Sequence, residues 1–122
     1  MRVLISFISA AVVIVSAGPG FAATAGRLAP KDIETTFFNG QPFTASTLSN
    51  VKFKMVFSPD GTMTREPVAK AGAKSEGTWK LTQDGFCSTW KGSKANCFQV
   101  RANGQNKWSV IAGTQAVATW SK

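Results

Sequence analysis

The chain has 122 residues, of which 43% are hydrophobic and 16% charged, so it fits one domain and has no room for a second core. The nucleotide-binding and barrel folds of most cofactor enzymes need about 150 to 250 residues and are excluded. The sequence contains no histidine and no tyrosine. The commonest general base, the commonest metal ligand and the usual phenolic acid are therefore missing, and we expect neither an enzyme nor a bound metal or cofactor.

The N-terminal segment 1–22 has the layout of a signal peptide. The basic Arg2 precedes an uncharged apolar run at 3–17, which helix-breaking residues then end. Small residues suit cleavage after Ala22, Ala23 or Ala25, and Ala22 is preferred. An uncleaved membrane anchor is the weaker alternative, because the run is shorter than the roughly 20 residues that cross a bilayer. We expect a periplasmic or secreted protein that does not span the membrane after cleavage.

The only cysteines are Cys87 and Cys97. An even pair in an exported chain predicts a disulfide, whereas a metal or redox pair would need further ligands or C-x-x-C spacing. The midpoint of the pair is Gly92, which lies in a predicted turn, so the two cysteines should face each other across an antiparallel hairpin. Such a bond would stabilise the fold by roughly 3 kcal/mol and needs no catalytic role.

The chain that follows Ala22 is basic, with 13 lysines and arginines, 6 acidic residues and a net charge of +7. This charge favours an anionic partner such as an envelope polysaccharide or a lipid. The basic residues are scattered and form no long run, so solubility alone is the alternative explanation, and we do not expect nucleic acid as the partner.

Residues 23–29 show no periodicity and predict a flexible leader to a single domain at 30–122. A short helix is predicted over 30–38, because Pro30 suits a first turn, Asp32 favours its positive end and Gly40 can end it. Ile33 and Phe37 lie one turn apart, so the helix should pack on the mouth or flank of a sheet.

After Gly40 the apolar period changes from near four to two, which predicts strands joined by short turns. The clearest strand is 51–57, where apolar residues alternate with Lys52 and Lys54. The longest loop is expected at 67–75. Seven strands are predicted, at 51–57, 62–66, 76–82, 86–91, 97–102, 107–112 and 115–122.

Successive hairpins without a helical crossover predict an all-β domain. A small antiparallel meander barrel is the first choice and a two-sheet sandwich the alternative. The four tryptophans suit core packing, while a ligand cavity and an exposed platform stay open as further uses. They are Trp79, Trp90, Trp108 and Trp120.

Several of these elements resemble small exported proteins of rhizobia-like alphaproteobacteria that are catalogued as a domain of unknown function. The resemblance rests on FSPDGTMT at 57–64, on G-T-W at 77–79, on the D-G turn at 84–85 and on the cysteine pair. It covers about 80 of the 122 residues. It implies export, a compact and lipocalin-like β fold and an association with the envelope or its polysaccharides, and it supplies no catalytic residue.

Two patterns in the sequence bear on function. The S-x-x-K strings at 49–52 and 88–91 fall on or beside predicted strands, where the serine and the lysine point to opposite faces, so neither predicts a nucleophile. Lys91, Arg101 and Lys107 alternate with apolar residues and are the candidate contacts to an anionic partner. We therefore expect a non-enzymatic binding module of the cell envelope, with a small protein inhibitor of an envelope or secreted hydrolase as the alternative.

Overall fold

A computed structural model of the protein describes residues 26–122. The expected signal peptide at 1–22 and the three candidate cleavage positions lie outside the described residues. No helix within 26–122 is long and apolar enough to cross a membrane.

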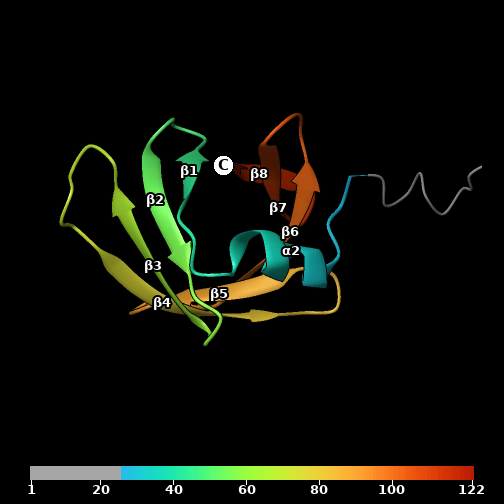
Figure 1. The fold of residues 1–122 in the computed structure, drawn as a ribbon, viewed down its shortest axis with the longest axis horizontal. Coiled ribbons are helices and arrows are strands. Elements are labelled where there is room, and N and C mark those ends of the chain that lie inside the picture. The colour runs from blue at the N-terminus through green and yellow to red at the C-terminus, as the bar shows by residue number, and fades with distance from the viewer. Residues whose placement is uncertain (1–25) are drawn as a thin grey trace, which may run out of the picture.

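The described chain forms eight antiparallel strands that close into a barrel in sequence order, with β1 paired to β8 (Figure 1). The strands are β1 Phe43–Thr47, β2 Lys52–Phe57, β3 Thr62–Pro67, β4 Ser75–Leu81, β5 Phe86–Trp90, β6 Asn96–Ala102, β7 Lys107–Ala112 and β8 Gln115–Ser121. The all-β prediction is confirmed, and the fold is the predicted barrel and not the two-sheet sandwich.

Strand β1 is the element that the sequence analysis missed. Its sequence FTAST offers only two apolar side chains, Phe43 and Ala45, so its alternation is weak. It is nevertheless the strand that closes the barrel, because it pairs with β2 on one side and with β8 on the other.

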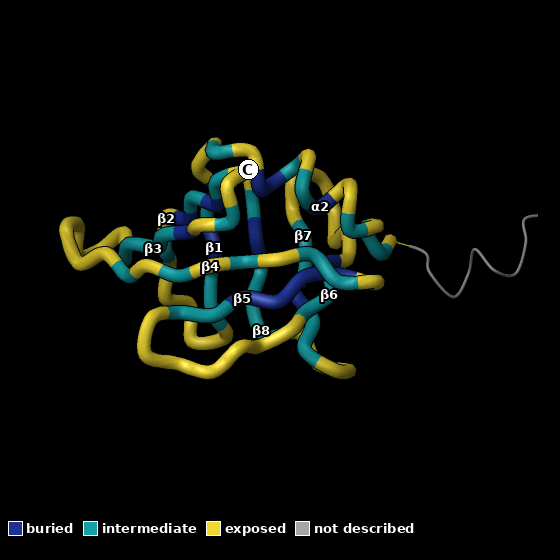
Figure 2. The backbone as a smooth tube through the Cα atoms, turned by 90° about the horizontal axis from the view of Figure 1, so that it is seen from below, coloured by how far each residue is buried: buried dark blue, intermediate teal, exposed yellow. Residues whose placement is uncertain are grey.

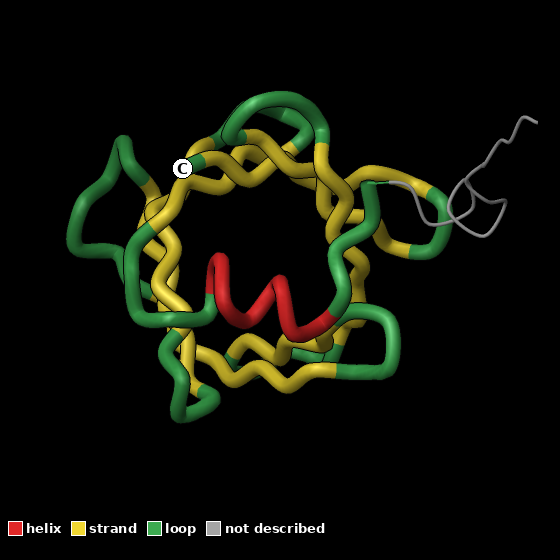
Figure 3. Tube along the Cα trace, turned by 45° about the vertical axis from the view of Figure 1, so that its right-hand side comes forward, coloured by secondary structure: helices red, strands yellow, loops and turns green. Residues whose placement is uncertain are grey.

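The predicted helix is confirmed as α2, Pro30–Phe37, with Pro30 in its first turn. Figure 3 shows α2 lying across the opening of the ring of strands. Ile33, Phe37 and Phe38 are at most 1% exposed. Phe37 meets the ring of Trp120 at 4.9 Å between centroids, and Phe38 stacks on Phe57 at 4.6 Å. The helix therefore closes one end of the barrel with aromatic side chains.

The core follows the alternation expected of half-buried strands. In β2, Met55 and Phe57 are buried while Lys52 and Lys54 are exposed. Figure 2 shows a similar change between half-buried and exposed positions along β4. The inner face of the barrel is thus apolar, and the tryptophans contribute to it: Trp120 is buried, and Trp79, Trp90 and Trp108 pack half-buried against the core.

The leader expected at 23–29 is described only from Gly26 onward. In this part the Leu28 N–H donates to the Val100 carbonyl at 2.8 Å, and Gly26 accepts from the Ala102 N–H. Leu28 also packs against the core. Residues 26–29 therefore lie along β6 as part of the folded domain.

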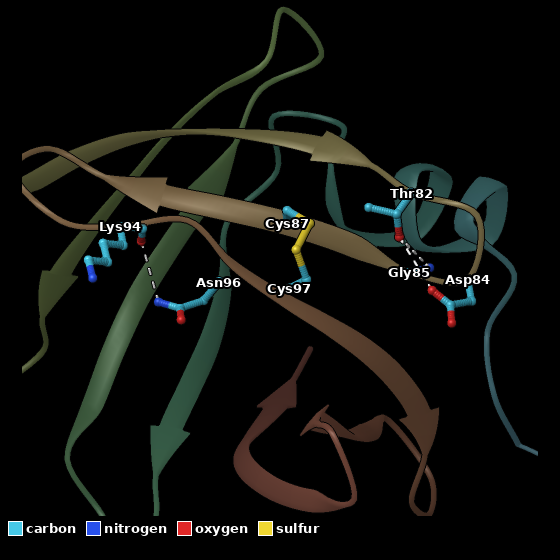
Figure 4. Close-up of a disulfide and its surroundings, with 7 residues drawn as sticks. All are labelled: Thr82, Asp84, Gly85, Cys87, Lys94, Asn96 and Cys97. Atoms are coloured by element: carbon cyan, nitrogen blue, oxygen red, sulfur yellow. Dashed lines mark hydrogen bonds between the residues drawn. A yellow bond between two sulfur atoms is a disulfide. The ribbon is translucent and has the colours of Figure 1, made fainter.

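Cys87 and Cys97 are paired directly across β5 and β6 and are joined by a disulfide, as predicted (Figure 4). Both side chains belong to the outer face, because their neighbours Phe86 and Phe98 point into the barrel. The predicted turn between them is also present, with Gly92 at a φ of 85°.

The two ends of the barrel differ. One end carries α2 and is called the helix end. The opposite end, called the distal end, is formed by the four loops 48–51, 68–74, 91–95 and 113–114. Side chains that point inward near the distal loops are not covered by the helix, and the candidate site lies there.

Candidate functional site

A cavity of about 130 Å³ lies inside the barrel, on the distal side of the aromatic core. Its walls are mostly apolar, and they include Phe53, Met55, Trp90, Phe98 and Val110. The pattern of inward-facing residues produces this lining, because every second residue of β2, β5 and β6 points to the interior. The cavity exists because small residues stand on β1 and β8, where Ala45 and Ala118 line it.

Among residues 26–122, Arg65 is the only charged residue that lines the cavity. It lies on β3, two residues after the buried Met63, so the strand alternation turns it inward. Its guanidinium carbon lies 4.2 Å from the centroid of the Trp90 ring and 5.2 Å from that of Phe53. Two aromatic rings of the cavity wall therefore hold the cation in place.

The hydrogen-bond donors of Arg65 meet no acceptor among the residues that the structure describes. Burial lowers the pKa of Arg65 from its ordinary value. The group still stays protonated, because a guanidinium does not lose its proton in proteins. Within residues 26–122 the Arg65 side chain has neither a hydrogen bond nor an ion pair, and the aromatic faces accept none of its five N–H donors in the plane of the group.

Ser88 is a second polar group in the cavity wall. It is 6% exposed and is the one buried polar residue of the described chain. Its strand neighbours Cys87 and Thr89 belong to the outer face, so the hydroxyl faces the interior. Among the described residues this hydroxyl has no hydrogen-bond partner, and a buried polar group without a partner is costly.

Outside the cavity, a polar depression of about 400 Å³ adjoins Arg65 and Trp90. These two residues line both spaces, so they stand between the barrel interior and the distal surface. Lys74 and Lys91 add two exposed cations to the depression, and Glu76 adds one carboxylate. An entering anion would therefore pass cationic groups before it reaches the apolar cavity.

A wider depression of about 610 Å³ lies on the outer face of β3, β4 and β5. It carries a row of threonines, namely Thr62, Thr64, Thr78 and Thr89, all exposed or half-buried. Its polar groups are open to solvent, whereas Ser88 is buried in the barrel and the Arg65 guanidinium packs on two aromatic rings, neither of them with a hydrogen-bond partner among residues 26–122. The interior cavity is therefore the better candidate site.

The three predicted anion contacts are not brought together. Lys91 lies in a distal loop, while Arg101 stands near the end of β6 and Lys107 at the start of β7, both at the helix end. The pairing of Cys87 with Cys97 fixes this separation, since it places Arg101 opposite residue 83 and far along the strand from Lys91. Of the three, only Lys91 lines the polar depression outside the cavity.

The sequence analysis also missed Arg65 and singled out Ser88 only within an S-x-x-K string. The structure separates that string, with Ser88 inside the barrel and Lys91 exposed. The available signal was a charged residue at an inward position of TMTRE, in step with Met63. Within 26–122 no group of three His, Cys, Asp or Glu side chains gathers that could hold a metal ion.

Comparison with known proteins gives no relative: neither a family model, nor a curated protein, nor a solved structure matches the chain.

Proposed function

We propose that the protein is an exported, non-enzymatic binding module that holds a small amphipathic anion inside its barrel. The apolar part of the ligand occupies the cavity, and its acidic group binds Arg65. One observation carries the proposal: a half-buried guanidinium at the mouth of an apolar cavity, with aromatic contacts only.

The chemistry of Arg65 selects the acidic group. A guanidinium can donate two parallel hydrogen bonds to a carboxylate or a phosphate. Such charge-assisted pairs are stronger than hydrogen bonds between neutral groups. The rings of Trp90 and Phe53 stabilise the cation by about 0.5 to 2 kcal/mol but use none of its in-plane donors. Ser88 offers a further donor or acceptor inside the cavity for a second polar atom of the ligand.

The size of the cavity limits the apolar part. At about 130 Å³ it is comparable to an engineered apolar cavity of about 150 Å³ that binds benzene. A single ring or a short acyl chain fits such a space, whereas a polymer does not. The proposal therefore narrows the expected anionic envelope component to a small acid, or to the acyl end of a lipid.

Export to the periplasm or the medium is part of the proposal. The apolar run at 3–17 with the small residues after it supports it, and so does the Cys87–Cys97 disulfide, which suits an oxidising compartment. The absence of enzyme activity is part of the same proposal, because the one charged group that lines the cavity with Ser88 is Arg65, and a guanidinium can accept no proton and so cannot act as a base.

The inhibitor alternative gains no support from the described residues. Such an inhibitor would use the flexible leader expected at 23–29 to plug its target, and residues 26–29 of that leader are instead hydrogen-bonded along β6.

Titration calorimetry with matched ligands tests the proposed function. Octanoate and benzoate should bind, and octanol and benzyl alcohol should bind at least about tenfold more weakly, because they lack the charge that Arg65 would pair with. Arg65→Gln should abolish the preference for the acid. Ala45→Leu should weaken both members of each pair, since the added atoms fill the cavity. Equal binding of acid and alcohol by the unaltered protein, or an acid preference that survives Arg65→Gln, would refute the proposal.

A further inference from the structure

The distal end carries the exposed apolar side chains of the barrel. Among residues 26–122, the large hydrophobic residues that are exposed are Leu48 at 78%, Val68 at 61% and Val51 at 46%. All three lie in distal loops, Leu48 and Val51 in one and Val68 in the next. The Val68 N–H donates to the Lys52 carbonyl at 2.9 Å, so these two loops lie side by side. The apolar residues therefore form one rim beside the cavity mouth.

The same loops contain basic residues and no acidic ones, and two carboxylates of the adjoining strands lie beside them: Glu66 accepts from the Gly72 N–H, and Glu76 lines the depression with Lys74 and Lys91. The four distal loops contain four lysines and no aspartate or glutamate. The lysines are Lys70, Lys74, Lys91 and Lys94, and all are exposed. The turns at the helix end differ, because 58–61 and 82–85 each contain an aspartate and 103–106 contains no charged residue. Apolar tips and lysines are thus combined at one end of the barrel, around the cavity.

We infer that the distal end docks on an anionic lipid surface, with Leu48, Val51 and Val68 inserted among the lipids and the lysines facing the head groups. An anionic bilayer matches both features of this surface. Its negative head groups attract each nearby lysine, and its interface accepts the inserted apolar side chains. A soluble polyanion would use the lysines but would leave the apolar rim in water.

This docking goes beyond the binding of a soluble ligand. It would set the cavity mouth, with Arg65 and Trp90, against the membrane, where amphipathic acids concentrate. A ligand could then pass between the bilayer and the barrel without crossing open water.

Co-sedimentation with vesicles tests the inference. Every variant is purified in the same form as the unaltered protein, so that any residues before Gly26 contribute equally throughout. Vesicles of equal parts phosphatidylglycerol and phosphatidylcholine are compared with phosphatidylcholine alone. Binding should require the anionic lipid and weaken as salt is raised.

Three double variants separate the possible causes of binding. Lys70→Glu/Lys94→Glu changes lysines in two distal loops that do not line the cavity, and should lower vesicle affinity at least about tenfold. Leu48→Ser/Val68→Ser keeps every charge and should lower it several-fold. The matched control Lys80→Glu/Lys107→Glu changes exposed lysines outside the distal end by the same amount and should have much the smaller effect.

Equal losses in the distal and control charge variants would overturn the inference, because they would show attraction by net charge alone. Unchanged binding in Leu48→Ser/Val68→Ser, with the lysine variant equally impaired on dextran sulfate, would overturn it in favour of a polyanion site. The proposed function is tested separately: Ala45→Leu fills the cavity and should weaken ligand binding, but it changes no charge and should keep vesicle binding within about twofold.

Discussion

Cys87 and Cys97 lie directly opposite each other at the narrowest ladder of the barrel. Only three residue pairs join β5 to β6, and the cysteine pair is the central one. The disulfide therefore joins covalently the two strands that share the fewest backbone pairs.

Cys87→Ser/Cys97→Ser should lower the free energy of unfolding by about 2 to 4 kcal/mol, because the unfolded chain gains conformational entropy when it is no longer cross-linked. Because both side chains belong to the outer face, ligand affinity of the molecules that remain folded should not change. Urea unfolding and calorimetry measure the two quantities. A variant that kept its stability and lost binding would show that the disulfide acts in function.

Export makes a prediction about the purified protein. The mature chain should begin near Ala23 and contain no free thiol, because the signal sequence and the disulfide both belong to an oxidising compartment. Intact mass measured with and without a thiol-alkylating reagent tests both points. Full-length mass, or two alkylated cysteines without reductant, would contradict the proposed location.

The local sequence pattern was enough to predict much of this fold, but it did not predict the pairing of strands that lie far apart in the sequence. The alternation of 51–57 and the cysteine spacing predicted the inner face of β2 and the register of β5 with β6. Closure through β1 and β8 depends on residues more than 70 positions apart, such as Ala45 with Trp120, and no local pattern encodes it. Arg65 was missed for a related reason. The inward position of Arg65 indicates a binding site only together with Trp90, which comes from another strand and lies beside it in the fold.

Gly85 marks a close approach between strands. A Cβ atom at this position would overlap the carbonyl oxygen of Phe98 on β6, and backbone on backbone cannot yield as a flexible side chain can. Gly85→Ala should cost about 3 kcal/mol of stability. The control is Gly92→Asn, where φ is +85° and no atom lies within 4 Å, since asparagine tolerates this conformation. Similar unfolding midpoints for the two variants would contradict the prediction.

The carboxylate of Asp60, in a turn at the helix end, should make the stability of the fold depend on pH. Its carboxylate accepts from Thr62 Oγ1 at 2.7 Å and from the Thr62 N–H at 3.0 Å, and these bonds lower its pKa below the ordinary 3.8. A lowered folded-state pKa adds stability above the unfolded value, and this is lost as pH falls through the folded value. Asp60→Asn should therefore lower the urea midpoint at about pH 6, and the gap should shrink as pH falls below the ordinary pKa of 3.8 and through the lowered folded-state pKa. In a Thr62→Val background, which lacks the hydroxyl donor, Asp60→Asn should change the urea midpoint less. A difference in midpoint that does not depend on pH would show that ionisation of Asp60 is not its cause.

Phe38 limits how deep the cavity can be. Its ring is 1% exposed and lies 4.6 Å from that of Phe57 and 5.2 Å from that of Phe86, the two rings that also line the cavity. Phe38→Ala should cost about 3 to 5 kcal/mol, because a buried ring is lost and only part of the space collapses.

The space left by Phe38→Ala lies behind Phe57 and Phe86, so these rings can move toward the helix end and lengthen the cavity. Folded molecules of the variant should then prefer decanoate over octanoate more strongly than the unaltered protein does. Phe38→Leu, which keeps most of the volume, is the matched control and should keep the original chain-length preference. Calorimetry at a temperature where both variants are folded measures the ratio. An unchanged ratio in Phe38→Ala would show that the acyl chain does not reach the helix end of the barrel.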